Sequence, residues 1–141
     1  MGKLSLLMIE RMDRVTAREP RARANARLQA IGRAYIDFAR AEPGWFRTAF
    51  SSARAHAAAG TSPSGSVPNP YEVLTAGLDE LVEVGGLTPE RRVGAEYAAW
   101  SAVHGLSSLL LDGPLHALPE DEVQRAIGIV LGVINSGLGQ R

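Results

Sequence analysis

The side chains that could carry catalysis are few and scattered along the chain. There are three histidines and no cysteine, which excludes thiol nucleophiles and thiolate metal sites. His56, His104 and His116 lie far apart in sequence and on different expected elements. Ser101, His104 and Asp112 cannot form a triad within one helix, because Asp112 would lie roughly 12 Å from His104 at about 1.5 Å of rise per residue. The sequence lacks the zinc-protease, nucleophile-elbow and phosphate-loop motifs, so we expect no catalytic residue, no metal and no cofactor.

Aromatic side chains, by contrast, recur on faces that periodicity places inward. Tyr35 and Phe38 continue one apolar stripe, and further aromatics follow at once between positions 45 and 50. Sites for apolar small molecules are commonly built between helices in this way, with a few polar groups that fix orientation. The candidate ligand-binding residues are Tyr35, Phe38, Trp45, Phe46, Phe50, Leu74, Leu78, Tyr97, Trp100 and His104. The alternative for any of these residues is an ordinary role in a filled core.

These side chains must be positioned by an all-helical fold. Three- and four-residue steps of apolar residues predict six helices over residues 3–18, 20–41, 44–58, 71–84, 88–112 and 120–137. Proline, glycine and serine dominate residues 60–70, which predicts a surface loop. The β-branched stretch 127–134 suggests a strand, but its length, its acidic start and the lack of a partner strand favour a helix.

Length and composition predict one folded domain. The chain has 141 residues, 45% of them hydrophobic, and a net charge of zero. Residues 1–40 contain nine basic and four acidic residues, a net charge of +5. This charge is typical either of a solvated helix surface or of a surface that binds nucleic acid. The apolar runs 4–9 and 126–134 are too short for a signal peptide and for a membrane span of ~20 residues. We expect a cytoplasmic protein without membrane contact.

Small residues form a second stripe on the helix predicted over 88–112. Gly94, Ala98, Ser101, Gly105 and Ser108 follow one another at steps of four, three, four and three. Each helical glycine costs about 1 kcal/mol relative to alanine, and close approach of another helix is the usual compensation. The last helix carries a similar small-residue line within a largely apolar surface.

A helix that is apolar on nearly all sides must be buried on more than one side, and a second copy of the chain is the simplest partner. The expected homodimer interface comprises Ala98, Ser101, Gly105, Ser108, Gly128, Leu131, Gly132 and Ser136. The alternative is that these small residues serve a helix crossing within one chain.

Two segments resemble a known family. AYIDFARAEPGWFRTAF (residues 34–50) resembles the Tyr-x-x-Phe-Ala-x-x-x-Pro-x-x-aromatic segment of C-terminal domains in TetR-type transcriptional regulators. WSAVHGLSSLLLDG (residues 100–113) resembles the signature of the WHG-domain class at Trp100, His104 and Gly105. The resemblance implies an all-α, six-helix effector-binding domain that dimerises through its last two helices. It further implies a ligand-sensing domain of a repressor, in which a small, mostly apolar effector controls DNA binding by allosteric coupling.

The chain departs from the family pattern at its start. The helix-turn-helix head of such regulators would need roughly fifty more residues, and nothing before Pro20 supplies two short helices with a tight turn. We therefore expect residues 1–141 to form one effector-binding and dimerisation domain, with residues 1–18 as the connecting helix. DNA would be bound only through a head domain outside this chain. Two alternatives stay open: a small all-helical enzyme using His104 in an aromatic pocket, and a pure dimerisation module.

Overall fold

The computed structural model describes residues 2–48 and 68–139, and within these ranges the chain is helical without a strand. The described helices are α1 (Gly2–Asp13), α2 (Pro20–Ala41), α4 (Pro70–Glu83), α5 (Pro89–Arg92), α6 (Ala95–Leu111) and α7 (Glu120–Gly139). Residues 43–48 are also helical, at the start of the helix predicted over 44–58. The remainder of that prediction, the loop up to residue 67, Phe50 and His56 lie outside the described residues.

Helix starts follow local capping chemistry. The Glu19 carboxylate accepts hydrogen bonds from the backbone amides of Arg21 (3.1 Å) and Ala22 (2.7 Å), and Pro20 occupies the first turn of α2. At α4, Asn69 and Glu72 form a reciprocal capping box with bonds of 2.8 and 3.0 Å. These caps fix the starts of both helices; α2 spans the predicted residues 20–41, and α4 lies within one residue of its prediction.

The first helix is shorter than expected. Helix α1 ends at Asp13, whereas the sequence predicted a helix up to residue 18. Val15 and Thr16 are β-branched and favour helices weakly, and the chain must reverse here to enter α2. Side chains from α2 then satisfy carbonyl groups at this end, because Arg27 donates to the Met12 carbonyl at 3.1 Å.

The helix predicted over residues 88–112 is divided into two helices, α5 and α6. Helix α5 ends at Arg92, and Gly94 adopts a φ of +78°, a left-handed conformation that side chains rarely adopt. Helix α6 starts afresh at Ala95. The long apolar stripe read through this region is therefore interrupted at its N-terminal end.

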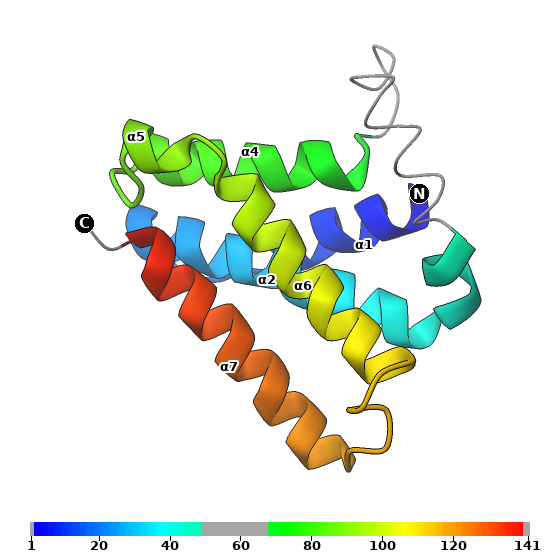
Figure 1. The fold of residues 1–141 in the computed structure, drawn as a ribbon. Coiled ribbons are helices and arrows are strands. Elements are labelled where there is room, and N and C mark those ends of the chain that lie inside the picture. Colours follow the sequence, from blue (N-terminus) through cyan, green and yellow to red (C-terminus); the bar gives the residue numbers. More distant parts are fainter. Residues whose placement is uncertain (1, 49–67, 140–141) are drawn as a thin grey trace.

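The helices pack around two adjoining hydrophobic clusters (Figure 1). Helices α1 and α2 lie side by side in opposite directions, and α4 packs against both. Helices α6 and α7 are antiparallel, contact each other and pack on α2. The first cluster joins α1, α2 and α4 with the start of α6 and the end of α7, whereas the second joins α2 with α6 and α7. Among the described residues, no helix combines the length and apolar character that crossing a membrane requires.

Candidate functional site: an aromatic cluster around His104

Side chains from three separate segments contact one another. Tyr35 on α2, Phe46 in the helical residues 43–48 and His104 on α6 form what we call the aromatic cluster. Tyr35 Oη lies 2.9 Å from His104 Nδ1, within hydrogen-bond distance. The Phe46 ring stacks on the imidazole with a centroid distance of 4.9 Å and meets Tyr35 edge-on at 6.2 Å. Aromatic residues 69 positions apart in sequence thus share one polar contact inside an apolar shell.

Burial controls the ionisation of both polar members of this cluster. Burial lowers the pKa of His104 below its ordinary value of 6.5, so the neutral imidazole is favoured at pH 7. Burial also raises the pKa of the Tyr35 hydroxyl, while a hydrogen bond with Trp100 acts in the opposite direction. The cluster therefore presents neutral hydrogen-bonding groups, which suits an uncharged ligand better than an ion.

Two further aromatic pairs flank the cluster. Phe38 and Trp45 contact each other edge-on at 4.7 Å, and Tyr71 lies 5.6 Å from Trp100. Tyr35 and Trp100 pack against both hydrophobic clusters, so the aromatic side chains lie at the junction between them. The structure thus brings together most of the aromatic residues that periodicity placed inward.

Three predicted ligand-binding residues do not lie with the aromatic cluster. Leu74 and Leu78 are buried in the first hydrophobic cluster, where Leu78 has no exposed surface. Tyr97 is 72% exposed, so the inward orientation expected of it is wrong. Tyr97, Trp100 and His104 all lie within α6, but the buried face of this helix runs through Ala95, Ala99 and Val103. The predicted stripe therefore lies at the margin of the buried face, and Tyr97 falls on the exposed side.

The other polar side chains of α6 do not extend the cluster into a catalytic arrangement. Ser101 is exposed, and Asp112 accepts two hydrogen bonds from Arg47, at 2.6 and 2.9 Å. Among the residues that the structure describes, no group of three His, Asp or Glu side chains could hold a metal ion. The cluster is therefore suited to orienting a ligand by a hydrogen bond at Tyr35 or His104.

The small residues expected at a dimer interface lie on the outer surface of α6 and α7. Four of them are exposed and three are half-buried, and a Cβ added at Gly105, Gly128 or Gly132 would meet open space. Ile129 and Val133 on α7 are 56% and 65% exposed beside these glycines and were absent from the predicted set. The sequence could have indicated them, because both are apolar residues directly after a glycine of the small-residue stripe.

Leu131 is the exception in the predicted interface. Its side chain is 8% exposed and packs in the second hydrophobic cluster of its own chain. A Cβ at Gly32 would lie 2.7 Å from Leu131 Cδ2, so Gly32 allows close approach of α2 and α7. Leu131 therefore belongs to the intrachain core, because the α2 contact turns it inward.

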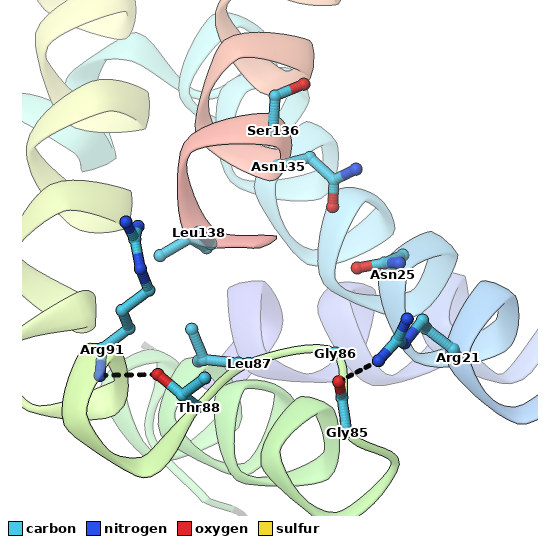
Figure 2. A pocket seen from close by; sticks show the side chains of 10 residues that line it. All are labelled: Arg21, Asn25, Gly85, Gly86, Leu87, Thr88, Arg91, Asn135, Ser136 and Leu138. Carbon is cyan, nitrogen blue, oxygen red and sulfur yellow. Dashed lines mark hydrogen bonds between the residues drawn. The ribbon is translucent and has the colours of Figure 1, made fainter. Parts of the chain in front are cut away.

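The structure also contains a pocket that no sequence pattern predicted, because its parts are distant in sequence. It lies between the first turns of α2, the loop 84–88, α5 and the end of α7, and has a volume of 390 Å³ (Figure 2). Arg21 and Arg91 line it, with Leu87 and Leu138 as apolar walls. We call it the arginine pocket. The only local signal was the glycine pair before Leu87, which permits another segment to pack closely on the backbone. The apolar periodicity did not indicate which segment that would be.

The comparisons with known proteins agree with the fold. No curated protein and no solved structure matches the chain. The family model described as "Tetracyclin repressor-like, C-terminal domain" matches residues 28–130. This match spans most of the chain and includes the aromatic cluster, and it does not address the finer WHG class, which stays a prediction. The chain belongs to the TetR-like C-terminal domain family, a family of regulatory domains in transcription regulators.

Proposed function

We propose that this chain is the ligand-sensing and dimerisation domain of a TetR-family repressor, and that the aromatic cluster binds a small, mostly apolar effector. The observation that carries the proposal is the contact between Tyr35 Oη and His104 Nδ1 inside an aromatic shell. An apolar site with one or two convergent polar groups is the usual form of a small-molecule site between helices. The same two groups can rearrange their hydrogen bond to accept or donate one to the effector.

Effector binding is proposed to act on DNA binding through α1, the helix that would connect the domain to a DNA-binding head. Helix α1 is tied to the body by Arg11, which bonds Asp37 at 3.0 Å, and by Arg27. The Arg27 guanidinium also bonds Glu80 on α4 at 3.0 Å, so one side chain joins three helices. A shift of α2 on ligand binding would be passed to α1 through these bonds, which is the differential contact that allosteric coupling requires.

Binding is tested with a panel of alkylphenols and naphthols, read by thermal unfolding and tryptophan fluorescence. The two tryptophans of the chain, Trp45 and Trp100, both belong to the pairs that flank the cluster. We expect a rise in unfolding midpoint together with a fluorescence change, both weakened in Tyr35→Phe. Tyr97→Phe is the matched control, because it removes an exposed hydroxyl from the same type of side chain. Binding that is equally strong in both variants would count against the site.

The domain is proposed to bind without turning its ligand over. Product analysis after incubation with any compound that binds should find only the starting material. Turnover that His104→Ala abolishes would replace this proposal with an enzymatic one.

Dimerisation is proposed to use the exposed small-residue faces of α6 and α7. Open space at Gly105 and Gly132 allows another backbone to approach, and the neighbouring Ile129 and Val133 would be buried. Gly105→Leu and Gly132→Leu should shift the chain from dimer to monomer in sedimentation experiments at micromolar concentration. Gly44→Leu is the control, since its position also faces open space but lies outside α6 and α7. A monomeric unsubstituted chain would refute the proposed interface.

A further inference from the structure

The arginine pocket lies apart from the aromatic cluster and has a different chemistry. Its lining comes from α2, the loop 84–88, α5 and the end of α7 (Figure 2). In Figure 2, Arg21 and Arg91 stand on opposite sides of the cavity, with Leu87 below and Asn135 above. No carboxylate side chain is among the lining residues. The cavity therefore combines two fixed positive charges with an apolar floor.

The two arginines are held in place by backbone carbonyl groups. Arg21 donates to the Gly85 carbonyl through Nη2, and Arg91 donates to the Gly137 carbonyl through Nη1 at 2.8 Å. A guanidinium has five N–H donors, so one bond to a neutral carbonyl leaves donors and the full charge for a ligand. Each side chain is thus oriented without being neutralised.

Six other arginines of the described residues are paired with carboxylates, whereas Arg23 and Arg33, like the pocket arginines, bond to neutral oxygen atoms. Carboxylates lie within ion-pair distance of Arg11, Arg14, Arg27, Arg40, Arg47 and Arg92. Near the pocket, hydrogen bonds from the backbone amides of Ala22 and Arg21 lower the pKa of Glu19, and the charge of Arg21 contributes to this shift. The positive charge of the pocket is therefore only partly offset.

Polar side chains complete the lining. Asn25 lies one turn after Arg21 on α2, and Asn135 reaches the cavity from α7. The Asn135 Oδ1 atom is buried without a hydrogen-bond partner in the described structure. An amide oxygen cannot bond to an anion, because both are acceptors; a flip of the side-chain amide would turn its Nδ2 group toward the cavity, where it could donate to an anionic ligand.

We propose that the arginine pocket binds a small organic acid that carries at least two anionic groups, one for each guanidinium. Guanidinium groups bind carboxylates and phosphates in a planar, two-point geometry, which favours such ligands over simple ions. The volume of 390 Å³ falls within the ~300–1,000 Å³ range of small-molecule sites. The site would bring the ends of α2 and α7 under control of a second, chemically distinct ligand.

Citrate is the probe for this proposal, with sodium chloride at matched ionic strength as the reference. Isothermal titration on the full chain should detect citrate binding. Arg21→Gln and Arg91→Gln should each weaken it roughly tenfold or more, the loss of one charge-assisted contact. Arg14→Gln and Arg125→Gln are the controls, because each removes one positive charge from an exposed surface position outside the pocket.

Two further measurements test the proposal even if a glutamine variant folds poorly. Arg91→Lys keeps the charge but loses the planar fork, so we expect a loss smaller than that of Arg91→Gln. Backbone NMR shifts on citrate addition should centre on residues 21, 25, 85–88 and 135–138. No binding beyond the salt reference, equal losses in the surface controls, or shifts centred on His104 would overturn it. Apolar probes should still bind Arg91→Gln, so this test is independent of the proposed effector site.

Discussion

The aromatic cluster and the arginine pocket are two candidate sites built by opposite means. In the aromatic cluster, side chains contact one another, and Phe46 is only 6% exposed while it stacks on His104. In the arginine pocket, side chains contact main-chain carbonyls of the next element and leave a cavity between them. The first region is held together by burial of rings, and the second by backbone geometry.

The difference shows which changes each region tolerates. A site made of packed rings loses stability when a ring is removed, because contacts disappear on all sides. A site made of loop and helix ends is sensitive to backbone conformation, above all at Gly85, whose φ is +78°. Three substitutions test this contrast, in order of expected effect.

Phe46→Ala should produce the largest loss. It removes a nearly buried ring that contacts Tyr35 and His104, and such truncations cost about 3–5 kcal/mol. Urea unfolding followed by circular dichroism measures the change. Thr48→Ala, on the exposed side of the same segment, should change the unfolding free energy little. Comparable effects of the two would mean that Phe46 is not part of the core.

Gly85→Ala should cost less, about 1–2 kcal/mol, because an alanine there must adopt a left-handed conformation. The added Cβ would also lie 3.4 Å from Arg21 Nη2 and tighten the wall of the arginine pocket. Thermal unfolding gives the measurement. Gly44→Ala is the matched control, since its Cβ meets open space at a helical position and should be neutral or slightly stabilising. An unchanged midpoint in Gly85→Ala would contradict the assigned conformation.

The smallest expected effect is the pH dependence contributed by His104. Its folded-state pKa lies below 6.5, so the unfolded chain binds the proton more readily, and stability falls as the pH drops below 6.5. The loss should be modest, because the side chain keeps some exposure to water. The unfolding free energy, measured between pH 7 and 5.5, should depend less on pH in His104→Gln than in the unsubstituted chain. In His116→Gln, which replaces an exposed histidine, the dependence should be unchanged. Equal curves for the two variants would assign the effect elsewhere.

Much of the fold was predictable because its signals are local. Pro20 and the break at Glu42-Pro43-Gly44 predicted both ends of α2, and the apolar steps from Leu74 with the glycines after Val84 predicted α4 within one residue. Tyr35, Phe46 and His104 were selected by stripes on separate segments, and the structure brings them together. The inward orientation predicted for Tyr97 is wrong because the buried face of α6 runs through Ala95, Ala99 and Val103, about a third of a turn or more from the predicted stripe.

The sequence by itself determined the helical class, the family and the apolar residues from which the aromatic cluster is made. These depend on periodicity, on capping and on motif spacing, all of which act within a few residues. Only the tertiary structure decided that Leu131 faces its own core and that Arg21 and Arg91 share a cavity. The first depends on how α2 packs against α7, and the second on how the loop after α4 lies against the start of α2 and the end of α7. Such contacts join residues far apart in the chain, and no local pattern records them.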